Sequence, residues 1–384
     1  MTARVWLHAA SLGDVNALSG LTRLLVSRGD HLTCSATTKA GQAQWRHLFP
    51  QLDQRAPPLL SKRSARRALE ETGAEVLITE LLEVWPAWVS TWSQAGVKIV
   101  VVDGRISSRT TWARALLFAY FRRIDLFCAQ TERDALLALH MGVPPSRIFT
   151  CGDAKLDSLL ARSSPPRSDV ELTPLIVGCV RPRDVRPLLG ALKLCPQVFN
   201  FTPILIAPRE LKLVPKLTRL LKSAGLRVIL DSQGERSGEQ EQRGEIRSPS
   251  SVIILDRFGQ LAARYYSSRV AIIGGTFYDR GQNLIEAALG GCEVIFGPRT
   301  DQIRAQSEAL IGSGGHQVET WREALELAAQ LLADPPPEPR RAGQAILSVS
   351  GALSKQIDTL DRLIFEPCLG QDRERSELST RLTP

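Results

Sequence analysis

The sequence lacks the short motifs that mark several common kinds of catalytic or metal site. Its seven cysteines form no CxxC pair and show no regular spacing, which excludes a disulfide framework and a cysteine zinc site and predicts reduced, mostly buried thiols in a cytoplasmic protein. The five histidines form no local metal pair. Neither a GxSxG nucleophile motif nor the lysine and spacing of a phosphate-binding P-loop is present.

Long hydrophobic runs are also missing. No apolar run approaches the roughly 18 residues that a membrane-spanning helix needs, so we expect no transmembrane segment and, at most, peripheral attachment to a membrane. The hydrophobic content of 43% and charged content of 23% are typical of a folded globular protein. Because 384 residues exceed a comfortable single core, two domains of roughly 150 to 200 residues are expected.

The net charge is positive. Lysine and arginine number 48 against 40 aspartates and glutamates, a formal balance of +8. Such a surplus favours anionic partners such as nucleotides, phosphorylated lipids, a membrane surface or nucleic acid, or it is simply a solvated basic surface. The densest basic run, Ser61 to Arg67, falls on a predicted helix. It is either a solvated face or a contact for anionic lipid.

A change of composition separates two halves of the chain. Between about Ala161 and Thr173 the sequence turns to Ser, Pro and Arg, which is typical of a linker. Apolar runs alternate with helical patterns on both sides of it, and a last helical pattern runs from about Ala342 to Ile364. We therefore predict an N-terminal domain at 1–165, a C-terminal domain at 166–345, a C-terminal helix at 346–366 and a disordered tail at 367–384.

The stretch from Val270 to Pro298 has the pattern of a strand, a glycine loop, a helix and a second strand. The first strand stops at Gly274-Gly275, and helical periodicity begins at Gly281. Such a loop lies at the carboxyl end of a parallel strand, where the free N–H groups of a helix start favour anions. Asn283 and Glu286 are three residues apart and would share one helix face. The alternative is a loop without a ligand, because glycines also commonly precede helices in loops that bind nothing.

A second strand-to-helix turn lies near the N-terminus. The strand pattern from Val5 to Ala10 is followed by the turn Ser11 to Asp14 and then by leucines at helical spacing. Asp14 stands at the start of that helix. Its carboxylate either caps the helix by accepting backbone hydrogen bonds or lies at the mouth of a ligand site as a general base.

Two further segments carry candidate binding groups. Val97 to Val102 is almost wholly β-branched, which predicts a strand buried on both faces of a parallel sheet. Arg105 and Arg109 follow it on a loop with hydroxyl side chains, which suits a phosphate or carboxylate, although an arginine paired with Asp103 explains them equally well. Glu80 to Trp92 holds three of the seven tryptophans, which form either core or an apolar ledge for an acyl chain.

Several motifs, in order along the chain, resemble those of the transferases of Kdo (3-deoxy-D-manno-octulosonic acid) that act in lipid A assembly. Together they run from residue 6 to residue 298, which makes chance similarity of a single loop a poor explanation. They are Trp6 to Asp14 (family pattern W-h-H-A-x-S-x-G-E), Thr79 to Pro86 (E-x-E-x-W-P), Asp103 to Ser107 (N-x-R-x-S), Gly152 to Asp157 (G-N-x-K-x-D), Pro208-Arg209 (P-R-H), Asp256 to Leu261 (D-x-x-G-E-L), and Gly274-Gly275 with Gly281 to Ala288 (G-G-S…G-G-H-N…E-x-A-A).

This resemblance implies a GT-B fold, with two Rossmann-like domains facing across a cleft. It implies transfer of Kdo from CMP-Kdo to a lipid A precursor, with inversion at the anomeric carbon, at the cytoplasmic face of the bacterial inner membrane. It implies no metal, no cofactor and no nucleic-acid partner. It also implies that the protein binds peripherally to an anionic membrane surface. The implied site residues are Asp14 as the catalytic base; Arg209, Gly259, Gly275, Gln282, Asn283 and Glu286 for the donor; and Ser11, Arg105 and Lys155 as further substrate contacts.

The chain also differs from the family pattern. The family's catalytic glutamate is Asp14 here, Glu210 stands for the histidine of P-R-H, and Gln260 stands for the glutamate of D-x-x-G-E-L. The segment 179–184 departs from the S-T-H-x-G-E loop of the family. Two alternative functions therefore stay open: a GT-B transferase with another sugar nucleotide or acceptor, and a non-catalytic paralogue that binds lipid or nucleotide.

Overall fold

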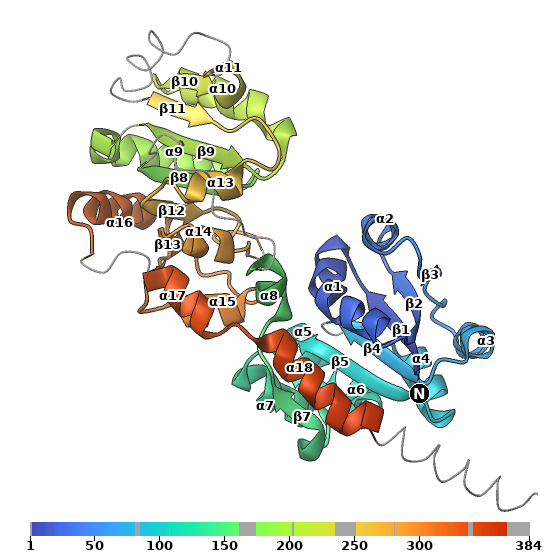
Figure 1. The fold of residues 1–384 in the computed structure, drawn as a ribbon. Helices are drawn as coiled ribbons and strands as arrows, with labels where there is room; N and C mark the ends of the chain where they lie inside the picture. Colours follow the sequence, from blue (N-terminus) through green and yellow to red (C-terminus); the bar gives the residue numbers. More distant parts are fainter. Residues whose placement is uncertain are drawn as a thin grey trace, which may run out of the picture. The chain divides into compact units, whose positions relative to one another are not determined.

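The computed structural model describes residues 2–80, 85–106, 108–160, 174–201, 203–234, 251–279, 281–336 and 341–366. The chain divides into two compact units, Met1–Arg162 with Ser350–Pro384, and Ser163–Val349. Each unit is built on a seven-stranded sheet with helices packed on it (Figure 1). The predicted linker 161–173 and the predicted disordered tail 367–384 lie outside the described residues.

The first unit has a parallel sheet in the order β3-β2-β1-β4-β5-β6-β7. Its strands are β1 (Arg4–Ala9), β2 (His31–Ala36), β3 (Asp53–Gln54), β4 (Val76–Glu80), β5 (Lys98–Gly104), β6 (Leu126–Ala129) and β7 (Ile148–Thr150). Its helices are α1 (Leu12–Ser27), α2 (Lys39–Leu48), α3 (Lys62–Thr72), α4 (Pro86–Gln94), α5 (Ser108–Trp112), α6 (Arg114–Phe121), α7 (Glu132–Met141), α8 (Ala154–Leu160) and α18 (Ala352–Leu360), the last followed by a short π-helical turn, Asp361–Phe365.

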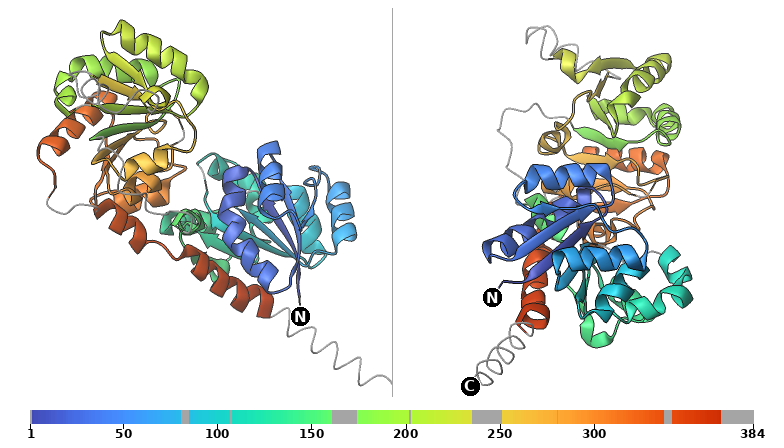
Figure 2. Two further views of the ribbon diagram at one scale, coloured as in Figure 1. Left: turned by 45° about the horizontal axis from the view of Figure 1, so that its top comes forward. Right: turned by 90° about the vertical axis from the view of Figure 1, so that its right-hand side faces the viewer.

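Both faces of this sheet carry a hydrophobic core. On one face α1, α2 and α18 pack on the sheet, and on the other α3, α4, α6 and α7 do so (Figure 2). The β-branched strand β5 contributes to both, with Val100 in one core and Val101 in the other, which confirms its predicted burial on both faces. Trp88 and Trp92 are buried in the second core, where Trp92 lies 5.3 Å from Trp6, ring centre to ring centre.

The C-terminal helical segment is two helices rather than the single helix predicted from about Ala342 to Ile364. The chain breaks between α17 (Arg341–Ser348) and α18 at Gly351, whose φ of 90° is a conformation that glycine adopts without strain. Asp157 holds the start of α18, because its carboxylate accepts hydrogen bonds from Gly351 N (2.8 Å) and Leu353 N (2.6 Å). The helix thus packs on the N-terminal unit.

We expect Asp157→Ala to loosen α18. Two backbone N–H groups lose their acceptor, which costs on the order of 1–3 kcal/mol. Hydrogen–deuterium exchange should become at least tenfold faster at Gly351 and Leu353, whereas Asp157→Asn, which keeps one acceptor oxygen, should show a smaller change. Unchanged exchange in the alanine variant would contradict the docking role of Asp157.

The second unit has a parallel sheet in the order β10-β11-β9-β8-β12-β13-β14. Its strands are β8 (Leu175–Val180), β9 (Ile204–Pro208), β10 (Arg227–Leu230), β11 (Ser251–Ile254), β12 (Val270–Ile273), β13 (Glu293–Phe296) and β14 (Gly315–Gln317). Its helices are α9 (Val185–Leu194), α10 (Val214–Ser223), α11 (Asp231–Gly234), α13 (Leu261–Tyr265), α14 (Ile285–Leu289), α15 (Arg304–Leu310), α16 (Trp321–Ala333) and α17. The described residues also include 3₁₀ turns at Pro145–Arg147, Pro196–Phe201 and Leu211–Leu213.

The fold prediction of α/β architecture with two parallel-sheet domains is confirmed. Within the described part of the chain, no helix combines the length and the apolar character needed to cross a membrane.

Candidate functional site

Each sheet has one place where the strand order reverses direction. In the first unit the chain runs outward from β1 through β2 to β3 and then returns to β4 beside β1. In the second, β8 and β9 lie on one side and β12 begins the other. Parallel sheets bind ligands at the carboxyl ends of strands at such points. The two turns singled out in the sequence, after β1 and after β12, lie at these two positions.

Asp14 caps its own helix with one carboxylate oxygen. Ser11 is the N-cap of α1, and its backbone N–H donates to Asp14 Oδ2 over 2.8 Å, forming half of a capping box. The N-cap is thus Ser11 rather than Asp14, which stands at the third helical position and accepts the Ser11 N–H with Oδ2. Oδ1 has no hydrogen-bond partner among the described residues, and the side chain is half-buried. A carboxylate held by one oxygen retains a second oxygen for a proton, so the capping role leaves the base hypothesis open.

Glu80 is a buried acid at the same edge that the sequence analysis did not select. It ends β4, the neighbour of β1, and is only 3% exposed. Its Oε2 has no hydrogen-bond partner in the described part of the chain. Burial raises the pKa of Glu80 well above its usual range, and the negative charges of Asp14 and Asp103 raise it further. The signal available in the sequence was a glutamate at the end of a strand adjacent to β1. Its motif partner Glu83 lies outside the described residues.

The segment Gly152 to Asp157 brings a lysine to this edge. A methyl group at Gly13 would lie 3.6 Å from Lys155 Nζ, so the ammonium lies against the turn that precedes Asp14. Lys155 also lowers the pKa of Glu80, opposing the carboxylates. The structure therefore brings together Ser11, Asp14 and Lys155, three of the predicted residues of the N-terminal half.

Asp103 accepts hydrogen bonds from Ala154 N (2.8 Å) and from Gln356 Nε2 (2.7 Å). The side chain of Arg109 lies outside the described part of the structure, so the pairing of Asp103 with an arginine stays a prediction. At Asp103 a φ of 50° turns the chain sharply. Arg105 follows on the loop, half-buried, and Ser107 lies outside the described residues. Burial and then the charge of Asp153 raise the pKa of Asp103 to about 7.

We expect this carboxyl group to make the stability of the protein depend on pH. A carboxyl whose pKa is raised by folding binds its proton more tightly in the folded chain, so its stabilising contribution is complete below about pH 4 and is lost as the pH rises through about 7. Asp103→Asn should flatten the decline of the free energy of unfolding between pH 5 and pH 8. Asparagine keeps the acceptor oxygen and tolerates positive φ. Urea unfolding at four pH values measures this, and an equally steep decline in the variant would contradict it.

In the second unit one buried aspartate joins the loops after β8 and β12. Asp184 Oδ2 accepts hydrogen bonds from Arg181 N and from Gly275 N, each over 2.8 Å. Gly275 has a φ of 71°, and its carbonyl accepts from Gly281 N over 3.0 Å. Burial raises the pKa of Asp184. The glycine loop is thus closed on itself and anchored to the turn between β8 and α9.

Charged groups gather around Cys179, the residue near the end of β8. Burial raises the pKa of its thiol to about 11, while the charges of Arg209 and Arg181 lower it and that of Glu286 raises it. The same edge therefore carries Arg209 and Glu286, two predicted donor residues, and Arg181, which the sequence analysis did not select. An arginine directly after the first strand of the domain was the available signal.

The start of the helix after the glycine loop was predicted too early. The helix begins at Ile285 rather than Gly281, because Gly281 has a φ of 94° and Gln306 Oε1 holds Leu284 N over 3.0 Å in a non-helical turn. Asn283 therefore precedes the helix, and its Oδ1 accepts from Ile285 N over 3.0 Å. Asn283 and Glu286 do not share a helix face, contrary to the prediction.

The remaining predicted donor residues are Gln282, which lies beside the glycine loop, and Gly259, which lies farther from it. Gln282 is half-buried beside Gly275, where its Cγ would lie 2.9 Å from an added methyl group. Gly259 is exposed, with a φ of 80°, on the turn after β11. In the sheet order β11 is two strands away from β8, so Gly259 would reach only a part of a ligand distant from the glycine loop.

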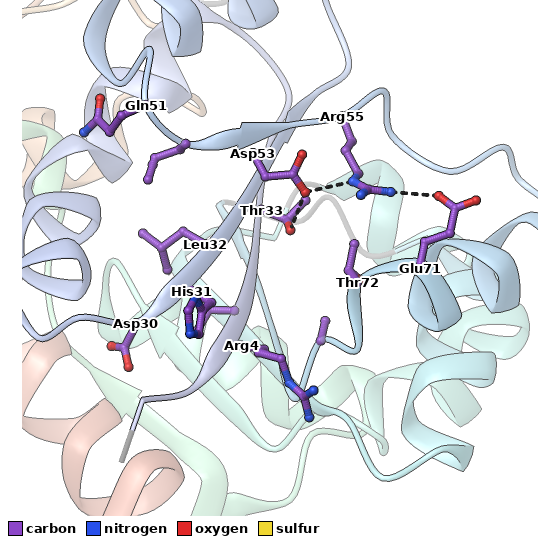
Figure 3. Close-up of a pocket in the computed structure, with 13 residues that line it drawn as sticks. Arg4, Asp30, His31, Leu32, Thr33, Gln51, Asp53, Arg55, Glu71 and Thr72 are labelled. Carbon is purple, nitrogen blue, oxygen red and sulfur yellow. Dashed lines mark hydrogen bonds and ion pairs between the residues drawn. The ribbon is translucent and has the colours of Figure 1, made fainter.

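A cavity of about 570 Å³ lies at the opposite edge of the first sheet (Figure 3). It is lined by the first residues of β1, β2 and β3. Three of its charged residues pair with one another: Arg55 donates to Asp53 over 2.8 Å and to Glu71 over 2.7 Å. Parallel sheets bind ligands at the carboxyl ends of their strands. Because this cavity lies at the amino ends, we do not assign it to the candidate site.

A protein-family model and individual relatives match the chain. The family described as 3-deoxy-D-manno-octulosonic-acid transferase (kdotransferase) matches residues 1–158. A 3-deoxy-D-manno-octulosonic acid transferase of Bordetella pertussis is 28% identical over 392 residues, covering 94% of this chain and 87% of that protein. The protein of that name from Aquifex aeolicus is 23% identical over 332 residues, covering 86% of each. The solved structure of Acinetobacter baumannii MurG, 13% identical, has a TM-score of 0.57 and covers 94% of this chain and 99% of that one.

Two Rossmann-like domains with loops of this kind at their switch points define a GT-B fold, the architecture of nucleotide-sugar glycosyltransferases and related epimerases. The sequence matches point to a particular family. The chain is similar to the Kdo transferases: their family model matches residues 1–158, and relatives of that name match most of the chain at 23–28% identity.

Proposed function

We propose that this protein is a glycosyltransferase that moves Kdo from CMP-Kdo to a lipid A precursor, with Asp14 as the catalytic base. The observation that carries the proposal is the half-fixed carboxylate of Asp14, with Oδ2 bonded to Ser11 N and Oδ1 without a partner among the described residues. It stands at the ligand-binding edge of a domain whose family model is that of the Kdo transferases.

The proposed reaction is a single displacement with inversion. Asp14 Oδ1 takes the proton of the acceptor hydroxyl, and the hydroxyl oxygen forms a bond to the anomeric carbon of Kdo. The bond from that carbon to the phosphate oxygen breaks, and CMP leaves with the electron pair. Burial raises the pKa of the neighbouring Glu80 well above its usual range, which makes Glu80 a poorer candidate for the base than Asp14.

The C-terminal domain would bind the donor. We assign Arg209 to the phosphate, whose growing charge a guanidinium stabilises, and Glu286 to the ribose hydroxyls. Four residues complete the proposed set: Gly259, Gly275, Gln282 and Asn283. In the N-terminal domain, Arg105 and Lys155 are proposed as contacts to substrate carboxylate or phosphate.

We further propose that the reaction needs no metal, and that the protein works at the cytoplasmic face of the inner membrane. Among the described residues, no three His, Cys, Asp or Glu side chains are grouped as a metal site would require. The test of the metal proposal is direct: transfer should proceed at the same rate with and without EDTA, and loss of activity that Mg²⁺ restores would refute it.

Nucleotide binding tests the proposed donor. We expect CMP and CMP-Kdo to raise the melting temperature of the protein and UDP to leave it unchanged. Stabilisation by UDP alone would instead support a GT-B transferase with another donor, an alternative that Glu210 and Gln260 keep open. Binding of lipid without any response to a nucleotide would support the non-catalytic paralogue.

A further inference from the structure

The neighbouring parallel strands β8 and β9 are each followed directly by an arginine (Figure 1). Val180 at the end of β8 is in register with Pro208 at the end of β9. Arg181 and Arg209 are the next residues of the two segments, and Arg209 N donates to Val180 O over 2.9 Å. Neighbouring strands lie about 4.8 Å apart. The two arginines therefore leave the same edge of the sheet side by side.

A kink at the end of β8 precedes the first of these arginines. The register between β8 and β9 shifts between Val177 and Val180, and Cys179 has a φ of 56°, which is uncommon for a residue other than glycine. Such bulges redirect the side chains next to them. A methyl group added at Gly275 would lie 3.2 Å from both Cδ and Nε of Arg181. The side chain of Arg181 therefore lies against the glycine loop.

Within the described part of the chain, neither guanidinium group forms an ion pair with a carboxylate. Glu210, next to Arg209, is exposed and pairs with Lys212. Asp184 is buried and accepts the backbone N–H of Arg181 instead of binding its side chain. Arg181 Nε is buried and has no hydrogen-bond partner among the described residues. A buried donor without an acceptor is costly, so a ligand with acceptor oxygens would be favoured here.

The Cys179 thiol, which both arginine charges reach, supplies no negative charge of its own. Burial raises its pKa to about 11, although the charges of Arg209 and Arg181 act to lower it, so the thiol is neutral near pH 7. Glu286 acts on the same thiol, but one carboxylate does not offset two arginines. Two positive charges at short range repel each other. An anionic ligand that contacts both arginines would relieve this repulsion.

We propose that Arg181 determines the class of donor by binding a carboxylate on the transferred sugar, next to Arg209 on the phosphate. The donor class is a nucleoside monophosphate sugar whose anomeric carbon carries a carboxylate. In such a molecule the phosphate and the carboxylate are attached to the same carbon atom, so the two anions lie side by side, as the two arginines do. A planar guanidinium matches a carboxylate with two parallel hydrogen bonds. This assignment rests on the proposed function.

The test is isothermal titration of the full chain with CMP and with CMP-Kdo, in the absence of acceptor. Arg181→Gln should weaken CMP-Kdo binding by about tenfold or more, because charge-assisted hydrogen bonds to the carboxylate are lost. It should change CMP binding by less than about threefold, since CMP has no carboxylate. Arg209→Gln should weaken the binding of both ligands. The matched control is Arg186→Gln, which removes an exposed charge from α9 and should bind both ligands as the wild type does.

A second variant keeps the test independent of folding. Arg181→Lys retains the charge and loses only the planar fork. It should bind CMP as the wild type does and CMP-Kdo more weakly, with part of the affinity that Arg181→Gln loses restored. Wild-type affinity of both Arg181 variants for CMP-Kdo would overturn the assignment of Arg181 and leave the proposed function intact.

Two other outcomes would also overturn the assignment. Equal losses for CMP and CMP-Kdo in Arg181→Gln would place Arg181 on the phosphate. Binding of UDP-N-acetylglucosamine without any binding of CMP-Kdo by the wild type would mean that the two arginines hold the two phosphates of a nucleoside diphosphate. In that case both the assignment of Arg181 and the proposed function would be wrong.

Discussion

Asp14→Asn is expected to reduce kcat for Kdo transfer by about a thousandfold, with little change in KM. A positioned base contributes on the order of 10²–10⁴ in rate, and asparagine cannot take the acceptor proton. Its amide oxygen still accepts the hydrogen bond that Asp14 Oδ2 receives from Ser11 N. The melting temperature should therefore stay within about 2 °C of the wild type. The measurement is steady-state release of CMP.

Two variants serve as controls for this result. Glu80→Gln replaces a neighbouring carboxyl whose pKa burial raises well above its usual range, so its kcat should stay within about tenfold of the wild type. Asp14→Glu restores the residue of the family pattern with a reach longer by one methylene, and we expect it to be active. If Asp14→Asn remains active while Glu80→Gln is inactive, the base is Glu80 and the assignment of Asp14 is wrong.

Gly275→Ala is expected to weaken CMP binding at least tenfold. Gly275 has a φ of 71°, where an L side chain is strained, and an added methyl would lie 2.9 Å from Gln282 Cγ and 3.2 Å from Arg181 Cδ. Both side chains would have to move, and the hydrogen bond from Gly275 N to Asp184 would be disturbed. The strain should also lower the free energy of unfolding by about 1–3 kcal/mol.

The matched control is Gly190→Ala within α9, where an added methyl meets no atom within 4 Å. It should leave CMP binding unchanged and slightly raise stability, because alanine favours a helix interior. Isothermal titration with CMP distinguishes the two variants. Equal affinity in Gly275→Ala and the wild type would show that the glycine loop does not contact the nucleotide.

The sequence was sufficient to predict both sheets because their strands are short apolar runs with strong β-branched character, as in β5. It also placed candidate groups at the switch points, since Asp14 and Gly275 each lie within five residues of the end of a strand. Local periodicity could not reveal the late start of α14, which depends on Gln306, a residue of another helix. Nor could it reveal the docking of α18, which Asp157 holds across almost 200 positions.

Burial explains why Glu80 and Arg181 were missed. A glutamate at the end of a strand is ordinary in sequence. It becomes notable only because folding removes it from solvent beside Asp14 and Asp103. Arg181 stands in a segment that departs from the family pattern, yet its backbone is tied to Asp184 and its charge acts on Cys179 together with that of Arg209. Both depend on contacts between segments far apart in the chain.

The most direct test of the central proposal is the mass of the lipid product. Purified protein is incubated with CMP-Kdo and a lipid A precursor, and the lipid is analysed by mass spectrometry beside an Asp14→Asn sample. We predict a lipid heavier by one or more Kdo residues, an equal amount of released CMP, and neither product with the variant. A folded protein that leaves the lipid mass unchanged and CMP-Kdo intact under these conditions would contradict the assignment as a Kdo transferase.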